Sequence, residues 1–273
     1  MRLFAPLSTG RLLGRRKRFF ADIALDDGRT IVAHCPNTGR MLGCLEPGAE
    51  VVVHGRSGAQ RKLPWTWVLV RAEGSWVAVE SSTAVAGVRE AWEQGRLPEF
   101  VGPAWAHGEV AYGRDGRSRI DLVLADVPRA ALLGAVNGAS RSGSTGPPTT
   151  PPTTPPIWVE VKATTWIRVE SGRRVAAFPD AVTSRGTKQL EDLVGCVEAG
   201  ARAAVVFAVM RDDAACFTPG DAIDPVYGRA LRDAARRGVE LVALGATIEV
   251  HGDDPHAPAS IDWALARRLP IEL

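Results

Sequence analysis

The amino-acid sequence predicts two domains, a small β-barrel followed by a mixed α/β domain. Two observations carry this prediction. Short strand patterns separated by turn residues follow one another through the first part of the chain. Beyond that part, strand patterns alternate with helical ones, which is the arrangement of a mixed α/β layer. We place the boundary so that the domains span residues 1–82 and 83–273.

The first domain is predicted from five strand patterns. They occupy residues 18–25, 30–34, 50–54, 65–70 and 76–79. Asp27-Gly28 between the first two is a tight hairpin signal. Several strands of this length, joined by turns, are typical of a small barrel of the OB-fold type.

The second domain begins with a helical pattern at residues 84–94, which ends at Gly95. Further helices are expected at residues 183–199 and 225–237, the latter with Asp224 as N-cap and Pro225 in its first turn. Strands are expected at residues 108–112, 119–124, 157–165, 174–177, 203–210 and 239–244.

Composition excludes several classes of protein. The chain has 273 residues, of which 45% are hydrophobic and 23% charged, values typical of a globular protein. It contains no apolar run long enough to span a membrane, and its first residues do not resemble a signal peptide, so we expect a cytoplasmic location. The four cysteines form no C-x-x-C pair, which argues against a disulfide scaffold or a structural zinc site.

One segment differs in composition from the rest. Residues 137–156 are rich in Gly, Ser, Thr and Pro and include a run of alternating Pro and Thr pairs. Such a segment cannot bury a core, so we expect a disordered or polyproline-like surface insertion without a catalytic role.

The clearest chemical signal lies in the strand pattern at residues 157–162. Residues two apart in a strand point to the same face, so Glu160 and Lys162 should project together. Asp121, in the strand pattern at 119–124, offers a second carboxylate. Two acids and a lysine suit a metal-dependent phosphodiester-cleaving site, although a surface ion pair would give the same spacing.

Two further segments could bind a polyanion. Arg15-Arg16-Lys17-Arg18 is the most basic run in the sequence. Alternatively, these residues are simply solvent-exposed charges at the start of a strand. The irregular turn at residues 35–41 carries Asn37, Thr38 and Arg40, which could donate to a phosphate or could form a structural turn. The net charge of +2 neither requires nor excludes a nucleic-acid partner.

Several strings together resemble the sugar fermentation stimulation protein A family. They are Arg16-Lys17-Arg18-Phe19, His34-Cys35-Pro36-Asn37-Thr38-Gly39-Arg40-Met41, Arg61-Lys62-Leu63-Pro64, Ser118-Arg119-Ile120-Asp121, Val159-Glu160-Val161-Lys162 and Phe178-Pro179-Asp180-Ala181-Val182-Thr183, and the likeness runs almost from end to end. The resemblance implies an N-terminal OB-fold, a C-terminal domain of the PD-(D/E)xK nuclease type, DNA binding, and a role in regulating sugar (maltose) metabolism in bacteria.

Carried over by this resemblance, Asp121, Glu160 and Lys162 match the nuclease motif. Glu109 is the expected additional acid, and Mg²⁺ (or Mn²⁺) is the expected cofactor, held by Asp121, Glu160 and Glu109. Lys162 would orient a water molecule or stabilise charge on the phosphate.

Arg185 and Lys188 begin a helix and are expected to contact the phosphate backbone of DNA. The chain departs from the family at the Pro/Thr insertion, at Glu80-Ser81, and at Gln189, where a histidine is usual. Glutamine cannot carry a proton, which puts acid–base chemistry at that position in doubt.

Two hypotheses of different classes follow, and both have DNA as the partner. The first is a metal-dependent DNA nuclease. The alternative is a non-catalytic DNA-binding regulator that retains the nuclease scaffold. RNA binding by the barrel is less favoured, because the sequence has no dense array of aromatic residues there.

Overall fold

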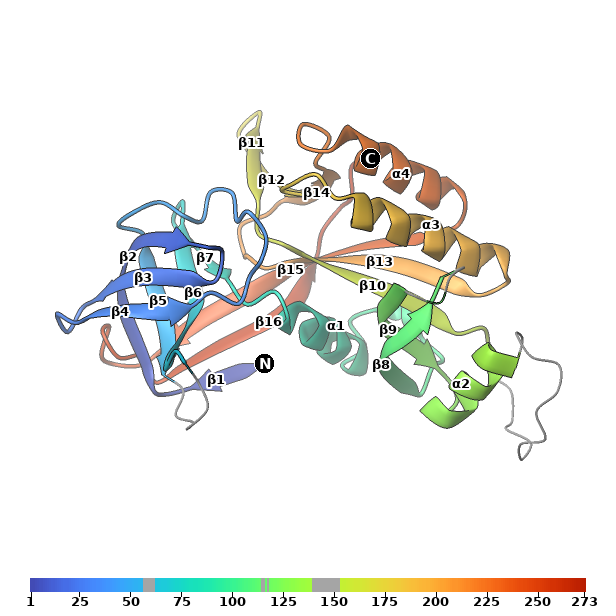
Figure 1. Cartoon of the computed structure of the whole chain (residues 1–273), viewed down its shortest axis with the longest axis horizontal. Helices are drawn as coiled ribbons and strands as arrows, with labels where there is room; N and C mark the ends of the chain where they lie inside the picture. The colour runs from blue at the N-terminus through green and yellow to red at the C-terminus, as the bar shows by residue number, and fades with distance from the viewer. Residues whose placement is uncertain (56–61, 114–115, 117, 139–152) are drawn as a thin grey trace.

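A computed structural model describes residues 1–55, 62–113, 116, 118–138 and 153–273, with the side chains of 135–138 excepted. The greater part of the expected disordered insertion, residues 139–152, lies outside the described residues. Figure 1 shows a barrel of N-terminal strands beside a larger domain of sheet and helices. The two-domain fold class predicted from the sequence is therefore confirmed.

The barrel consists of six strands in the order β4-β3-β2-β5-β6-β7. Their bounds are β2 (Leu7–Arg16), β3 (Phe20–Leu25), β4 (Thr30–His34), β5 (Glu50–Gly55), β6 (Trp65–Ala72) and β7 (Ser75–Ala78). A parallel pairing of β4 with β6, at His34 and Thr66, closes the sheet on itself. Alternate residues of β3 are buried, as expected for a strand with one face in a core. At the centre Trp67 is fully buried, and its indole N–H donates to the carbonyl of Leu69 at 2.8 Å.

A seven-stranded sheet forms the centre of the second domain, in the order β1-β16-β15-β13-β10-β9-β8. The bounds are β1 (Arg2–Phe4), β8 (Trp105–Tyr112), β9 (Ser118–Ala125), β10 (Ile157–Thr164), β13 (Arg202–Val209), β15 (Glu240–His251) and β16 (Ser260–Arg268). Strands β10, β13 and β15 are parallel, and antiparallel strands flank them. The first strand, β1, pairs with β16 rather than with the barrel. The division at residues 82 and 83 stays a prediction.

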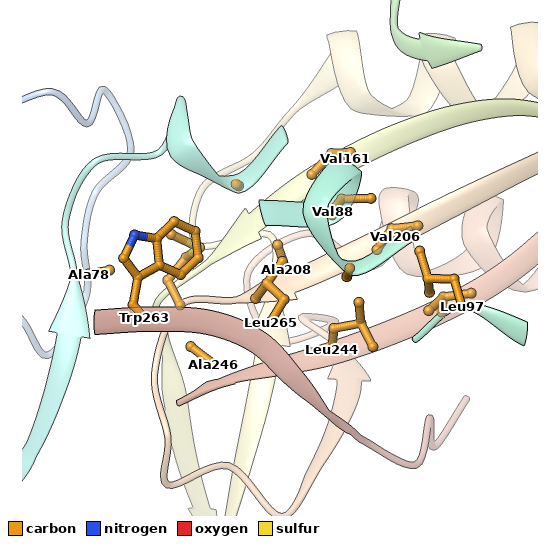
Figure 2. Packing of buried hydrophobic residues seen from close by; sticks show 14 of the residues in the cluster. Ala78, Val88, Leu97, Val161, Val206, Ala208, Leu244, Ala246, Trp263 and Leu265 are labelled. Atoms are coloured by element: carbon orange, nitrogen blue, oxygen red, sulfur yellow. The ribbon is translucent and has the colours of Figure 1, made fainter. Parts of the chain in front are cut away.

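Helices cover both faces of this sheet. Helix α1 (Thr83–Glu93) packs on one face, and its Val88 lies in one apolar cluster with Val161, Val206 and Leu244, as Figure 2 shows. The helix approaches closely because of Gly87, where a Cβ would lie 2.8 Å from the Trp263 ring.

Helices α3 (Ser184–Glu198) and α4 (Pro225–Arg236) cover the opposite face. The remaining elements are α2 (Arg129–Gly138), the short 3₁₀ helix at Pro98–Phe100, and a three-stranded sheet of β11 (Ile167–Glu170), β12 (Arg173–Phe178) and β14 (Cys216–Pro219). None of the helices in the described part of the chain combines the length and apolar character needed to cross a bilayer.

Paired caps fix where α3 and α4 begin. The hydroxyl of Thr183 accepts a hydrogen bond from the N–H of Gly186 at 3.0 Å. Asp224, the predicted N-cap, accepts from the N–H of Tyr227 at 3.0 Å and, through its other oxygen, from the N–H of Thr183 at 2.8 Å. One carboxylate therefore stabilises the starts of both helices and ties the start of α3 to that of α4.

An ion network joins the barrel to the second domain. Arg211 is 1% exposed and donates to Asp213 from two nitrogens, at 2.6 and 2.7 Å, and to the carbonyl of Thr165 at 3.1 Å. Arg174 also donates to Asp213, and it reaches the carbonyl of Glu73, in the turn between β6 and β7, at 3.0 Å. The bonds between Arg211 and Asp213 within the second domain are thus buried, whereas the bond from Arg174 that reaches the barrel is exposed to solvent.

Candidate metal centre

Neighbouring strands bring the two predicted acids together. In the register of β9 and β10, Leu122 pairs with Val159, so Asp121 and Glu160 follow at the next position. The N–H of Val161 donates to Asp121 Oδ2 at 2.8 Å, which anchors one oxygen of that carboxylate. The long segment between these strands in the sequence therefore does not separate their side chains in space.

Glu160 is buried on the face of the sheet that α3 covers, with 4% of its surface exposed. Its Oε1 accepts hydrogen bonds from Lys162 Nζ at 2.7 Å and from Gln189 Nε2 at 2.6 Å. Lys162 also donates to Gln189 Oε1 at 2.8 Å, which completes a ring of three side chains. Glu160 Oε2, by contrast, is buried and has no hydrogen-bond partner among the described residues.

The environment disfavours charge on both acids. Burial raises the pKa of Glu160 above its usual value, and the nearby Lys162 only partly opposes this effect. Burial likewise raises the pKa of Asp121, against the opposing hydrogen bond from Val161, and the charge of Glu109 raises it further. Two partly desolvated carboxylates in one pocket need a positive partner beyond Lys162 to be stable in the charged form.

Two buried tyrosines lie within the field of Glu160. The pKa values of Tyr112 and Tyr227 are raised, first by burial and next by the charge of Glu160. Neither hydroxyl has a hydrogen-bond partner in the part of the chain that the structure describes. Both phenols therefore stay neutral and add no charge to the site.

The carboxylates face a pocket of ≈ 520 Å³. Its lining is Glu109, Ser118, Arg119, Asp121, Glu160, Arg185, Lys188 and Gln189. Glu109 is exposed and has φ 55°, a left-handed conformation that few residues other than glycine adopt. Strain of this kind often accompanies functional sites.

The residues present fit a divalent cation. Within the described ranges, no three side chains of His, Cys, Asp or Glu are gathered into a ready ligand cluster. The unpartnered Oε2 of Glu160 and the carboxylate of Asp121 nevertheless supply oxygen ligands, which are the type that Mg²⁺ and Mn²⁺ prefer. Glu109, on the adjoining strand, is the third acid of the same pocket.

The predicted cations of α3 differ in their surroundings. Arg185 is exposed at the pocket rim, where its charge lowers the pKa values of both Asp121 and Glu160 against the larger effect of burial. Lys188 Nζ instead bonds Ser118 Oγ and Asp192 Oδ2, each at 3.1 Å. Its charge is therefore shared with a carboxylate, and Arg185 is the less encumbered of the two cations.

Two residues predicted to bind nucleic acid are engaged inside the protein. Arg15 donates to the backbone carbonyls of Arg18 and Gly39, each at 2.9 Å, and of Asn37. Asn37 is 7% exposed, and its amide bonds Gly39 N–H at 2.8 Å and the carbonyl of Val79 at 3.0 Å. We interpret both side chains as structural, because these contacts shape the turn at residues 35–41.

The other predicted barrel cations lie at the surface. Arg16 forms an ion pair with Asp22 at 2.8 Å, whereas Lys17, Arg18 and Arg40 are exposed. Thr38 is exposed as well. The turn at residues 35–41 therefore presents Thr38 and Arg40 outward on a scaffold built by Arg15 and Asn37.

Two residues of this region acquire roles that the sequence did not indicate. Gln189, noted only as a departure from a family pattern, bridges Glu160 and Lys162. Asp180, named in the sequence only as part of a family string, accepts the N–H of Met41 at 2.8 Å and so links the barrel to the segment before α3. No local pattern predicts either contact, since each joins residues far apart in the chain.

Comparisons with known proteins agree with this architecture. Family models match residues 13–79, described as the SfsA N-terminal OB domain, and residues 83–252, described as the sugar fermentation stimulation protein RE domain. The chain belongs to the sugar fermentation stimulation protein family. The resemblance identified in the sequence is thereby confirmed.

Individual relatives span the whole chain. A sugar fermentation stimulation protein homolog of Geobacter sulfurreducens is 40% identical over 97% of this chain and 96% of its own length. That of Geobacter metallireducens is 38% identical over 100% of both chains. The solved structure of Pyrococcus furiosus SfsA in complex with Ca²⁺ has a TM-score of 0.74 and 23% identity, and the match covers 100% of this chain and 98% of that one. This last likeness concerns the fold.

Proposed function

We propose that the protein is a metal-dependent phosphodiesterase that acts on DNA, with its reaction centre at Asp121, Glu160 and Lys162. The observation that carries the proposal is the buried, unpartnered Oε2 of Glu160 beside Asp121, in a pocket rimmed by Arg185. An orphaned carboxylate oxygen in this position is costly unless a ligand completes it.

The free oxygen of Glu160, rather than an excess of negative charge, favours a divalent cation. The pocket is lined by three acids and by three cations at its surface, Arg119, Arg185 and Lys188, while Lys162 is the ammonium that bonds Glu160 directly and leaves Oε2 without a partner among the described residues. A bound Mg²⁺ or Mn²⁺ would polarise the scissile phosphate and lower the pKa of an attacking water. The Ca²⁺ in the Pyrococcus furiosus structure supports a divalent site in this fold.

The protein's own groups have distinct roles in this proposal. Asp121 and Glu160 bind the cation. Lys162 lies 2.7 Å from Glu160 Oε1 and stabilises negative charge as it develops on the phosphate oxygens. Arg185 holds the adjacent backbone phosphate at the pocket rim.

A second candidate function is DNA binding without cleavage, as in a regulator of sugar metabolism. One observation favours it. Lys162 is engaged by both Glu160 and Gln189, and Glu109 is not gathered with the other two acids into a ligand cluster within the described chain. Such a site would bind a phosphate without the complete set of groups for hydrolysis.

Cleavage of plasmid and single-stranded DNA in a Mg²⁺ or Mn²⁺ titration separates the two candidates. Wild-type protein should cut in the presence of the cation and stop cutting when EDTA is added. Glu160→Gln and Lys162→Met should abolish cleavage. Glu170→Gln is the matched control, because Glu170 also pairs with a basic residue two positions away on a strand, Arg168, at 2.8 Å.

The outcomes are distinct. Cleavage that survives in Glu170→Gln and is lost in Glu160→Gln supports the phosphodiesterase. Binding by wild type with no cleavage under any metal would leave the second candidate. DNA binding that does not weaken as salt increases would contradict both, because a phosphate-driven contact releases counterions.

A further inference from the structure

The turn between β2 and β3 presents cations in a backbone conformation that disfavours them. Lys17 and Arg18 have φ values of 50° and 63°. This left-handed region is favoured by Gly and Asn in tight hairpin turns. Both side chains are exposed, and neither forms an ion pair with a residue that the structure describes. Two exposed cations at positions where the backbone prefers glycine make this turn a candidate binding surface.

Aromatic rings adjoin these cations. Phe19 is the last residue of the turn and is 46% exposed. The guanidinium of Arg16 lies 5.3 Å from the ring centroid of Phe20. Exposed π-faces among positive charges are the combination that binds unpaired nucleobases, because bases stack on the rings while the cations contact phosphates.

Arg15 holds this turn against the loop that follows β4. It donates to the carbonyl of Arg18 on one side and to those of Asn37 and Gly39 on the other. The N–H of Cys35 also donates to the carbonyl of Phe19 at 2.8 Å. The hairpin turn and the loop therefore form one braced unit, on which Thr38 and Arg40 are exposed beside the turn.

The same unit is joined to the start of α3. The N–H of Met41 donates to Asp180 Oδ2, and Asp180 lies only three residues before the N-cap, Thr183. Figure 1 shows the loop after β4 on the side of the barrel that faces the second domain. Arg185, in the first turn of α3, then lines the pocket that contains Glu160. A series of hydrogen-bonded segments thus runs from the hairpin turn to the pocket.

We propose that this surface binds the single-stranded part of a nucleic acid and leads it into the pocket. We call it the hairpin track and define it by Lys17, Arg18, Phe19, Thr38, Arg40 and Arg185. A base stacks on Phe19, and the backbone phosphates meet the cations in sequence. The inference rests on the proposed function, since it names the form of substrate that reaches that site.

A single strand suits the track better than a duplex. Stacking on Phe19 requires a base whose face is free, whereas the bases of a duplex already stack on one another. The pocket volume of ≈ 520 Å³ is within the range that encloses one small ligand, ~300–1,000 Å³. A splayed nucleotide and its phosphate fit such a space, while an intact double helix has to stay outside it.

Fluorescence anisotropy with the full chain in EDTA tests the proposal without any cleavage. The probes are a labelled single-stranded oligonucleotide, a length series of it, and the same sequence as a blunt duplex. We expect the single strand to bind about tenfold more tightly than the duplex, and Phe19→Ala to remove most of that difference. Lys17→Ala should reduce the slope of log affinity against log salt by about 0.7, the value for one phosphate of a single strand.

Phe4→Ala is the matched control. Phe4 is 61% exposed and has the guanidinium of Arg2 at 5.9 Å from its ring, but it belongs to β1 at the far edge of the large sheet. We expect no change in single-strand affinity for this variant. Phe19→Trp keeps a stacking face and should restore binding, which separates a stacking role from a loss of folding.

Two results would overturn the hairpin track. One is a duplex that binds as tightly as the single strand, and the other is a Phe19→Ala variant with wild-type affinity and wild-type circular dichroism. If DNA is cleaved at the pocket and yet the track variants bind and cut normally, the track fails and the phosphodiesterase stands. If the track binds single strands as described and no metal ever supports cleavage, only the phosphodiesterase fails.

Discussion

Replacing Gln189 with leucine should weaken divalent-cation binding without unfolding the protein. The side chain is 7% exposed and joins Glu160 Oε1 at 2.6 Å to Lys162 Nζ at 2.8 Å. Leucine has a similar size and removes both bonds. Among the described residues, Glu160 then keeps Lys162 as its only hydrogen-bond donor, and the orientation of its free oxygen, Oε2, is no longer fixed from the helix side.

The magnitude follows from the bonds that are lost. A hydrogen bond to a charged group contributes about 1.5–3 kcal/mol. The bond is present without the metal as well, so only the part by which it is stronger in the bound state weakens metal affinity; because ~1.4 kcal/mol corresponds to a factor of ten, the upper bound on the loss is about 10- to 150-fold. Changes to residues that orient metal ligands typically cost about 10–100-fold, in agreement with this range.

Electron paramagnetic resonance of free Mn²⁺ during a titration measures this affinity directly. Gln94→Leu is the matched control, since Gln94 also donates through Nε2 to a glutamate, Glu90, but at 3.4 Å on an exposed surface. Gln189→His can form one of the two bonds and should recover part of the loss. Wild-type Mn²⁺ affinity in a folded Gln189→Leu variant would refute the reasoning.

Three further predictions concern stability and the insertion. Asp213→Asn breaks the buried pair with Arg211 and should lower the free energy of unfolding in urea by about 3 kcal/mol, whereas Glu73→Gln, at an exposed acid, should cost less than about 1 kcal/mol. Burial alone raises the pKa of Asp213, but the bonds from Arg211 and Arg174 lower it overall. The stability that the charged Asp213 contributes to the fold is therefore complete above the ordinary Asp pKa and is lost as the pH falls through the lowered value. The unfolding free energies of Asp213→Asn and wild type should converge in acid. Asn37→Ala should lower the free energy of unfolding by about 1–3 kcal/mol, as thermal or urea melts would show, because buried backbone groups lose their partners. Exchanging residues 139–152 for a Gly-Ser segment of equal length should change Mn²⁺ affinity by less than about twofold, because the composition of this segment predicts an insertion whose replacement affects mainly loop entropy.

Local patterns predicted much of the fold. The helix expected at residues 183–199 is present as α3, and its apolar residues Leu190, Leu193 and Val194 are buried in the cluster that includes the sheet. The Asp224–Pro225 signal marks the start of α4 correctly, because capping depends on neighbouring residues alone. The sequence predicted that Asp121 and Glu160 share one site because each lies in a short strand pattern, and the strands that contain them are neighbours in the sheet.

Long-range pairing accounts for what the sequence did not reveal. β16 has the alternating burial of a half-exposed strand, yet its pairing with β1 joins the two ends of the chain, and no local signal specifies this. The contact of Met41 with Asp180 likewise depends on how the domains meet. The ring formed by Gln189 with Glu160 and Lys162 depends on where α3 crosses the sheet, which periodicity does not determine.

Anomalous diffraction from crystals of this protein soaked in Mn²⁺ tests the central claim most directly. The account predicts one strong peak within bonding distance of Glu160 Oε2 and the Asp121 carboxylate, with Lys162 and Gln189 still on Glu160 Oε1. It also predicts that the peak disappears in Glu160→Gln. If crystals at saturating Mn²⁺ showed anomalous peaks elsewhere and none at these two carboxylates, that result would contradict the assignment of this pocket as a metal centre.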